Sequence, residues 1–419
     1  MSALSTIRAL LDQGQVKKAE IAIAKELRAD SHGIAPHDLL TLRARAKLYT
    51  SRPEGAIDDL TRARALDPTI AQDPEWLEVL ADSHLSRFEL SAVGLVERVD
   101  IQQAETLYRS LLVDYPDYRN IGWIAYQLGR LLAIKNLPDD AMAMFKQAQL
   151  SRSVVDALPA YCLERMGYIE FYEYRHIQRA LDYLDLAFRA YPTHEDRGWL
   201  VQLYLLRGRI LRDSHRLAEA TEAAETALKM SASIRKASRS LQRETLFTAC
   251  EILSRSAGGE KRVVELVEQF FELSRRPQGI DVTWSRAYEM LADALASLGR
   301  YERAVDAYLA ALQYNPYHPW EVSILYRTAA AYYQHGDYQR ALNALVHGLD
   351  VARAENQAVD FRHYDLLGNA HYALGNYPEA VAAYDQALQL VARSDAIVDK
   401  ILHYRAFALE KGSHNPVTG

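Results

Sequence analysis

Apolar residues recur at helical spacing along most of the chain, most clearly over residues 284–316, WSRAYEMLADALASLGRYERAVDAYLAALQYNP. The first half of this segment carries one apolar stripe, formed by Tyr288, Leu291, Ala292 and Leu295. The second half carries another, formed by Ala304, Tyr308 and Ala311. Side chains three or four positions apart lie on the same face of an α-helix. The pattern therefore predicts two amphipathic helices.

A very short junction separates the two predicted helices. Gly299 interrupts the first stripe, Tyr301 begins the second and Pro316 follows its end. Glycine readily takes the left-handed conformation that closes a helix, so the junction predicts a tight turn. The same arrangement recurs over residues 325–345 and 364–387, which makes the segment one copy of a repeat.

The second-helix alanine of this repeat can be followed back to the start of the chain. It recurs every 37 to 48 residues, with a weaker Val264 in one copy, at Ala19, Ala56, Ala104, Ala141, Ala180, Ala220, Ala304, Ala341 and Ala380. In four copies a proline follows 12 residues later, at Pro68, Pro116, Pro192 and Pro316. Each copy exposes an apolar face that only its neighbour can cover. We therefore expect an all-α fold, an α-solenoid of about ten helix–turn–helix repeats closed by a C-terminal capping helix.

The expected repeats form a single solenoid over residues 1–410. Their ranges are 1–35, 37–70, 74–118, 120–154, 157–193, 198–232, 238–276, 284–318, 319–356 and 360–394, followed by the capping helix at 396–410 and a flexible tail at 411–419. The third repeat has an additional stretch between its helices, residues 86–100, and the seventh lacks the small and aromatic signature residues. Each departure is either a bend in the superhelix or sequence drift, and we favour drift.

These motifs resemble the tetratricopeptide-repeat (TPR) family. In that family a large residue, Leu–Gly and Tyr mark the first helix, a Gly–x–Tyr turn follows, and Ala, an aromatic residue and Ala mark the second helix before a proline. Residues 364–387, YDLLGNAHYALGNYPEAVAAYDQA, show most of this pattern. The resemblance implies a right-handed superhelix whose first helices line a concave groove. It also implies a role in binding proteins or peptides.

Composition limits the functions that are compatible with this fold. Many of the 26 tyrosines are explained as bulky fillers in the repeats, with a polar tip near the surface. A net charge of −6 does not favour a nucleic-acid binder, which usually carries a strong basic surplus. No apolar stretch approaches the length of a membrane span, and Arg8 interrupts the N-terminal apolar run before a signal peptide can form. Cys162 and Cys250 give no disulfide framework, so we expect two packed thiols in a cytoplasmic protein.

The sequence gives no positive sign of catalysis. It contains no phosphate-binding loop, no GxGxxG after a strand and no HExxH. His363 and His371 stand eight residues apart and could share a helix face, but their repeat positions favour surface and packing roles over a metal site. We therefore expect no enzyme activity, no cofactor and no metal.

The resemblance places partner contacts at first-helix positions that the core does not use. Carried over to repeats four to six, these positions emphasise Tyr126, Arg130, Arg165, Tyr168, Arg209 and Arg212. Arginine pairs bidentately with carboxylate or phosphate, so such a wall would suit an acidic or phosphorylated segment of a partner. The alternative is an ordinary solvated wall, with salt bridges from these arginines to Glu164 and Asp213.

Asn369 is a further candidate contact, because some peptide-binding TPRs hold the ligand backbone with an asparagine at this position. The set of Lys, Asn and Arg residues that clamps a C-terminal carboxylate in chaperone-binding TPRs does not occur in any three consecutive repeats. We therefore do not predict binding of chaperone tails.

Three functions compete at this point. We favour a scaffold or adaptor that binds a partner segment in the groove. The alternative is a ligand-sensing regulator that acts through a partner, and an enzyme is a remote third. The sequence leaves open the partner, the oligomeric state, and whether the groove or residues 86–100 make the main contact.

Overall fold

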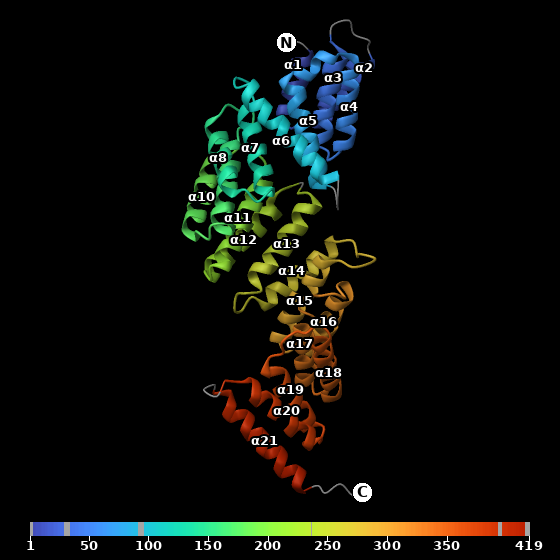
Figure 1. Cartoon of the computed structure of the whole chain (residues 1–419), viewed down its shortest axis with the longest axis vertical. Coiled ribbons are helices and arrows are strands. Elements are labelled where there is room, and N and C mark those ends of the chain that lie inside the picture. Colours follow the sequence, from blue (N-terminus) through green and yellow to red (C-terminus); the bar gives the residue numbers. More distant parts are fainter. Residues whose placement is uncertain (1–2, 29–33, 91–95, 236, 393–395, 415–419) are drawn as a thin grey trace. The chain divides into compact units, whose positions relative to one another are not determined.

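The computed structural model describes residues 3–28, 34–90, 96–235, 237–392 and 396–414. This part of the chain is helical apart from turns and connecting segments, and it contains no strand (Figure 1). The chain divides into two compact units, unit 1 (Met1–Asp196) and unit 2 (Arg197–Gly419). The predicted fold class, an all-α succession of helix pairs, is confirmed.

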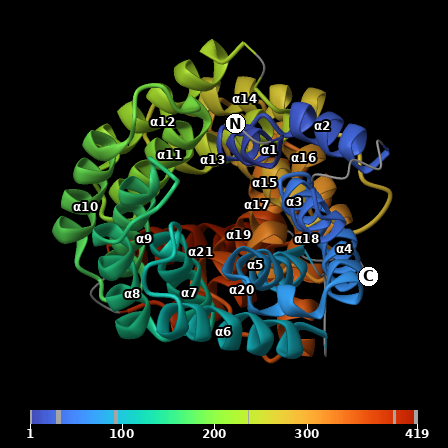
Figure 2. The ribbon, with the colours of Figure 1, turned by 90° about the horizontal axis from the view of Figure 1, so that it is seen from above.

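Unit 1 holds five successive helix pairs within its described residues. They are α1 (Ala3–Asp12) with α2 (Val16–Arg28), α3 (Pro36–Leu48) with α4 (Pro53–Leu66), α5 (Pro74–Leu90) with α6 (Val96–Asp114), α7 (Ile121–Ile134) with α8 (Pro138–Leu150), and α9 (Leu158–Tyr172) with α10 (Ile177–Ala190); a short 3-10 helix, η1 (Pro68–Gln72), follows α4. In Figure 2, α5, α7 and α9 lie on the inner side of this unit, and α6, α8 and α10 lie on its outer side. The first helices of successive pairs therefore share one face of unit 1.

Unit 2 holds five further pairs and one closing helix within its described residues. They are α11 (Arg197–Asp213) with α12 (Leu217–Ser233), α13 (Arg239–Leu253) with α14 (Glu260–Leu273), α15 (Val282–Ser297) with α16 (Tyr301–Tyr314), α17 (Glu321–His335) with α18 (Tyr338–Ala354), α19 (Phe361–Ala373) with α20 (Tyr377–Leu390), and finally α21 (Ile397–His414). The seventh pair, α13 and α14, is thus helical although its signature residues are missing.

The last helix covers the apolar face that the final pair would otherwise expose. Ile401 and Ala408 of α21 are buried in one cluster with Tyr384 of α20. Such a closing helix is what a stack of repeats needs at its end. Helix α21 continues four residues beyond the expected end at 410, and residues 415–419 of the expected tail lie outside the described residues.

In each pair whose turn lies within the described residues, one residue of the turn takes the left-handed conformation. Gly299 has φ +73°, which confirms the turn predicted there. Four other pairs place a residue with a Cβ at this point, with φ from 55° to 60°: Ser51, Asn136, Arg175 and His215. This conformation costs a non-glycine residue about 1–2 kcal/mol. Packing of the two helices must therefore hold these four turns in place.

Small residues allow the two helices of a pair to approach closely. The nine second-helix alanines identified from the sequence are all 0% exposed: Ala19, Ala56, Ala104, Ala141, Ala180, Ala220, Ala304, Ala341 and Ala380. First-helix glycines also face large rings directly. A Cβ added to Gly129 would lie 2.7 Å from Cε1 of Phe145, and one added to Gly368 would lie 2.6 Å from Cε1 of Tyr384. The small residues of the repeat pattern therefore mark the positions at which helices are in close contact.

The additional stretch of the third repeat, residues 86–100, mostly lengthens its two helices. Both α5 and α6 extend into it, while residues 91–95 lie outside the described part of the chain. Asp100 of α6 is 0% exposed; its Oδ2 accepts from Nε of Arg87 at 2.9 Å, and its Oδ1 lies 2.6 Å from Nδ1 of His84. These contacts fix α6 against α5.

From the sequence we also make predictions about the two cysteines, about two histidines as metal ligands and about membrane spans. Cys162 and Cys250 are buried, and burial raises the pKa of each thiol to about 12. His363 is buried and packs against Tyr326, with ring centroids 4.6 Å apart and the ring planes tilted by 39°. Among the described residues there is no group of three or more His, Cys, Asp or Glu placed to hold a metal ion. None of the described helices combines the length and the apolar character that crossing a membrane requires.

Candidate functional site

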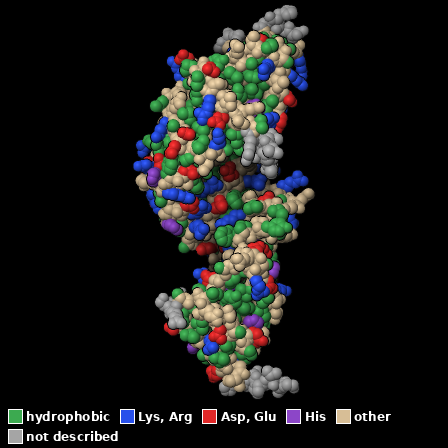
Figure 3. Space-filling model, in the orientation of Figure 1, with side chains coloured by type: hydrophobic (Ala, Val, Ile, Leu, Met, Phe, Trp, Pro, Cys, Tyr) green, Lys and Arg blue, Asp and Glu red, His purple; other side chains and the backbone are tan. Residues whose placement is uncertain are grey.

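Unit 1 contains two adjoining cavities. The larger cavity has a volume of about 650 Å³ and is lined by residues of α1, α3, α5, α7 and the segments around α9 and α10. The smaller cavity has a volume of about 310 Å³. Glu89 and Arg130 line both, so the two cavities are neighbours on one surface. Cavities of this size are typical of ligand sites. On the surface visible in Figure 3, basic and acidic side chains are interspersed.

The larger cavity is rich in carboxylates. Its charged lining consists of six acids, two arginines and one histidine: Asp12, Glu78, Asp82, Glu89, Asp156, Glu195, Arg45, Arg130 and His194. Glu78 and Asp82, here called the α5 carboxylates, stand four residues apart, so they lie on the same face of α5. This cavity thus differs in charge from the arginine wall that the sequence led us to expect.

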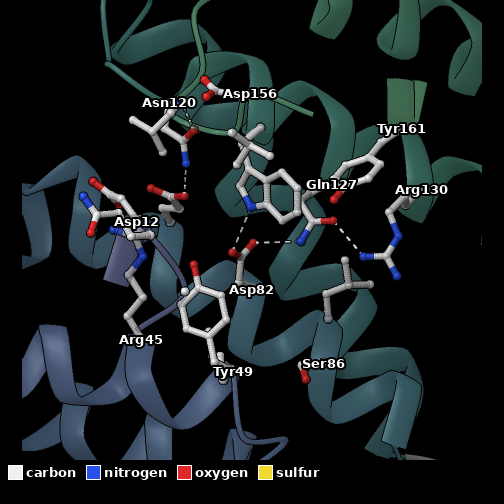
Figure 4. Close-up of a pocket in the computed structure, with 18 of the residues that line it drawn as sticks. Asp12, Arg45, Tyr49, Asp82, Ser86, Asn120, Gln127, Arg130, Asp156 and Tyr161 are labelled. Atoms are coloured by element: carbon white, nitrogen blue, oxygen red, sulfur yellow. Dashed lines mark hydrogen bonds and ion pairs between the residues drawn. The ribbon is translucent and has the colours of Figure 1, made fainter. Parts of the chain in front are cut away.

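Asp82 is held by three neutral donors. Its Oδ1 accepts from the hydroxyl of Tyr108 at 2.6 Å. Its Oδ1 also accepts from Nε2 of Gln127 at 3.3 Å, and its Oδ2 accepts from Nε1 of Trp123 at 3.2 Å; Figure 4 shows these two hydrogen bonds. Burial raises the pKa of this carboxyl, and the three hydrogen bonds only partly oppose that effect. The aromatic and amide donors therefore orient Asp82 without neutralising its charge.

Glu78 is the more deeply buried of the α5 carboxylates, with an exposure of 3%. It accepts hydrogen bonds from the Tyr118 hydroxyl and from the side-chain amide of Asn120. Burial raises the pKa of Glu78 to about 7, against the attraction of Arg45 and with added repulsion from Asp82. Because the α5 carboxylates interact, they titrate as a pair, and the charge of the cavity changes near neutral pH.

Arg45 lines the larger cavity, and it shares its acidic partners Asp12 and Glu75 with two further arginines. Nη2 of Arg45 lies 2.9 Å from Oδ1 of Asp12, and Nη1 of Arg119 lies 3.2 Å from Oδ2 of the same residue. Nη2 of Arg8 lies 2.7 Å from Oε2 of Glu75. Arg45 consequently acts on the α5 carboxylates only by attraction over a longer distance.

The smaller cavity brings together three residues predicted from the sequence, Arg130, Arg165 and Tyr168. Tyr168 is 39% exposed, so its ring is open to a partner. A fourth predicted residue, Tyr126, is only 7% exposed and packs against Phe145, with ring centroids 5.6 Å apart. Tyr126 therefore supports the wall from behind, and Tyr168 presents its ring at the surface.

Both arginines of the smaller cavity have partners within unit 1. Arg130 donates from Nη1 to Oε1 of Gln127 at 2.8 Å and pairs with Glu89. Nε of Arg165 lies 3.1 Å from Oε2 of Glu164. The attraction of Glu164 raises the pKa of Arg165 further, so this guanidinium is always charged. The contact with Glu164 is one that the solvated-wall alternative expected.

The remaining predicted contacts belong to unit 2. Arg209 donates from Nη2 to Oγ1 of Thr248 at 2.8 Å. Arg212 donates from Nε to the adjacent Asp213 at 2.7 Å, as the solvated-wall alternative expected. Asn369 accepts through Oδ1 from the hydroxyl of a buried tyrosine of α20 at 2.9 Å. Each of these three side chains therefore stabilises contacts inside unit 2.

The α5 carboxylates were missed by the sequence analysis. Their only signal is a pair of acids four positions apart in WLEVLADSHL, residues 76–85. Acids on helices are ordinarily exposed, and the donors Tyr108, Tyr118 and Trp123 come from positions 26 to 41 residues further along the chain. A pattern of local spacing does not reveal that they meet.

Family models identify the repeats directly. A tetratricopeptide-repeat model matches residues 285–354, and a second tetratricopeptide-repeat model matches residues 364–392. The chain contains tetratricopeptide repeats. The two matches span most of α15 to α18 and of α19 to α20. Tetratricopeptide repeats generally serve protein interactions and not catalysis.

Several solved tetratricopeptide-repeat structures are similar to parts of this chain. A tetratricopeptide repeat protein from Parabacteroides merdae is 13% identical, with 68% of this chain and 98% of that chain covered and a TM-score of 0.42. The C-terminal part of a TPR repeat-containing protein from Cytophaga hutchinsonii is 16% identical, with 66% and 99% covered and a TM-score of 0.44. YrrB, described as a TPR protein with an unusual peptide-binding site, is 15% identical, with 50% and 93% covered and a TM-score of 0.36. No curated protein matches the chain.

Proposed function

We propose that this tetratricopeptide-repeat protein is a non-catalytic scaffold or adaptor that binds a segment of a partner polypeptide at the two cavities of unit 1. The observation that carries the proposal is the pair of adjoining cavities, about 650 and about 310 Å³ in volume. Arg130, Arg165 and Tyr168 line the smaller one. Tyrosine and arginine are enriched among the residues that contribute most to binding at protein interfaces.

The smaller cavity suits an acidic or phosphorylated side chain of the partner. A guanidinium has five N–H donors in a planar fork that matches carboxylate and phosphate oxygens. The contact of Arg165 with Glu164 involves its Nε, and a further side-chain hydrogen bond joins Arg165 to Tyr126. The Arg165 side chain is still 42% exposed, so part of its guanidinium remains open to a ligand. Glu164 would then remain as the internal counter-ion, and the exposed ring of Tyr168 would cover the bound group.

Cross-linking mass spectrometry in the source cell would identify the partner segment, and a synthetic peptide of that segment would give its affinity. We expect Arg165→Gln and Tyr168→Ala each to weaken binding about tenfold, or about 1.4 kcal/mol. Arg179→Gln is the matched control, because Arg179 is exposed on α10, the second helix of the same pair. If both cavity variants bind the peptide as tightly as the control does, the proposed site is wrong.

A further inference from the structure

Among the described residues, some carboxylates of the larger cavity form no ion pair with a basic side chain of the protein. Two of its six acids have an arginine partner, Asp12 with Arg45 and Glu89 with Arg130, and Asp156 lies 3.5 Å from Nε2 of His194, which is a cation only when protonated. Glu78, Asp82 and Glu195 remain. Within the described residues, no Lys, Arg or His nitrogen lies within 4.0 Å of these three carboxylates. The cavity therefore holds an excess of negative charge.

This arrangement differs from that of a comparable buried acid in the same unit. Asp59 is 1% exposed, and both Nη2 of Arg43 and Nζ of Lys47 lie 2.6 Å from its carboxylate oxygens. A buried carboxylate is costly unless hydrogen bonds and a cation offset its loss of water. The α5 carboxylates have the hydrogen bonds and lack the cation, and they face a cavity.

The α5 carboxylates also keep capacity for additional donors. Each carboxylate offers about four acceptor sites. Asp82 uses three of them and Glu78 uses two in the recorded hydrogen bonds. The hydrogen bonds come from neutral side chains on other elements, which hold both carboxylates in position. The free sites are therefore available to an entering ammonium or guanidinium group.

The rest of the cavity wall suits the body of a long basic side chain. Apolar surface comes from Leu48, Leu85 and Val155, and aromatic rings come from Tyr49 and Trp123. Lysine and arginine bury their aliphatic stems on apolar surface and keep the charged end with polar groups. Aromatic faces also attract cations.

We propose that the larger cavity receives a lysine or arginine side chain of the bound polypeptide, with its cation held by Glu78 and Asp82. The inference rests on the proposed function and adds a sequence requirement to it. The two cavities share Glu89 and Arg130, so one extended segment can place a basic side chain in the larger cavity and an acidic one in the smaller. A free amine would use the larger cavity alone, which is why we assign the cation to a polypeptide.

Isothermal titration calorimetry with the full chain tests whether the larger cavity binds a basic side chain. The measurement is made at about pH 8, which lies above the pKa of Glu78, and at about 0.15 M salt. The probes are an acetylated, amidated peptide of alternating lysine and alanine, the same peptide with glutamate for lysine, and 1,5-diaminopentane. We expect the lysine peptide to bind at least about tenfold more tightly than either other probe.

Three variants locate the binding. Glu78→Gln removes one carboxylate, and Ser86→Trp fills the cavity without changing its charge. Each substitution should lower the affinity for the lysine peptide about tenfold. Asp114→Asn is the matched control, because Asp114 is an exposed acid at the end of α6, and it should bind as the wild type does. Circular dichroism shows which variants fold, and if Glu78→Gln does not, Ser86→Trp decides the result.

Several outcomes would overturn the inference. Equal affinity of the lysine peptide for wild type and both cavity variants would show attraction to surface charge alone. Diaminopentane binding as tightly as the peptide would exclude a polypeptide side chain as the ligand. If Arg165→Gln and Tyr168→Ala weaken the native partner segment while Glu78→Gln does not, the inference fails and the proposed function stands. The reverse pattern would leave the inference standing and remove the smaller cavity from the binding site.

Discussion

Glu78→Gln removes a buried acid that holds its proton more tightly in the folded chain than in the unfolded chain. Burial raises the pKa of Glu78 from an ordinary value of 4.5 to about 7. Asp82 on α5 adds to the rise, whereas Arg45 on α3 and the hydrogen bonds from Tyr118 and Asn120 oppose it. Glutamine has nearly the same shape, still accepts a hydrogen bond and carries no charge at any pH.

The sign of the effect follows from the state in which the proton is bound. Below about pH 4.5 the folded and unfolded chains both keep the proton, so ionisation costs the folded state nothing. Between about pH 4.5 and about pH 7 the unfolded chain ionises and the folded chain does not, so wild-type stability falls as the pH rises. Above that range both ionise, and the loss stays constant.

The magnitude follows from the size of the shift. One pKa unit corresponds to about 1.36 kcal/mol. A rise from 4.5 to about 7 therefore costs the wild type roughly 3 kcal/mol of stability once both states are ionised. The glutamine variant loses none of this. We expect its advantage in the free energy of unfolding to grow by roughly 2 to 3 kcal/mol between about pH 5 and about pH 8.

Urea unfolding of the full chain, followed by circular dichroism over this pH range, measures the difference between variant and wild type. Titration of groups far from Glu78 cancels in that difference, whereas the altered titration of Asp82, which titrates as a pair with Glu78, is part of it. Asp114→Asn serves as the control, because Asp114 is exposed on α6 and lines neither cavity. A Glu78→Gln difference that is constant, or that shrinks as the pH rises, would refute the argument that burial governs this carboxyl.

Three other predictions test the packing of the repeats. Gly368→Ala should destabilise the chain by about 1–3 kcal/mol in urea unfolding, because its Cβ would lie 2.6 Å from a buried tyrosine ring. Arg327→Met should cost roughly 2–4 kcal/mol in the same measurement, because it removes an ion pair of 2.6 Å from Glu289, which is 5% exposed; no loss would mean that this pair is replaceable. Cys162 and Cys250 should not react with a thiol reagent near neutral pH until the chain unfolds, since burial raises the pKa of both thiols to about 12; rapid labelling of native protein would contradict their burial.

The sequence was sufficient to predict the repeated helix pairs because their contacts are local. The second-helix alanines and Gly299 act between neighbouring helices, so their regular spacing marks the fold directly. The same turn was harder to recognise at Ser51 and Arg175, where a residue with a Cβ takes the left-handed conformation. There the packing of the pair overrides local preference, and no glycine marks the turn.

The candidate site could be predicted only in part. Arg130, Arg165 and Tyr168 lie together because they occupy first-helix positions that the resemblance marks as available. The α5 carboxylates could not be found in this way, since their burial depends on side chains from α6, α7 and the segment between them. Distant contacts of this kind leave no periodic signal in a single sequence.

The most direct test of the binding surface is photo-cross-linking from the rim of the larger cavity. A benzophenone amino acid at Gln13, an exposed residue that lines the cavity, would be compared with the same group at Lys146, which is exposed on the second helix α8. From position Gln13 we expect cross-linking to a partner segment that contains a lysine or arginine. From position Lys146 we expect no such product. Equal cross-linking at both positions, or a product at Lys146 alone, would contradict binding in the cavities of unit 1.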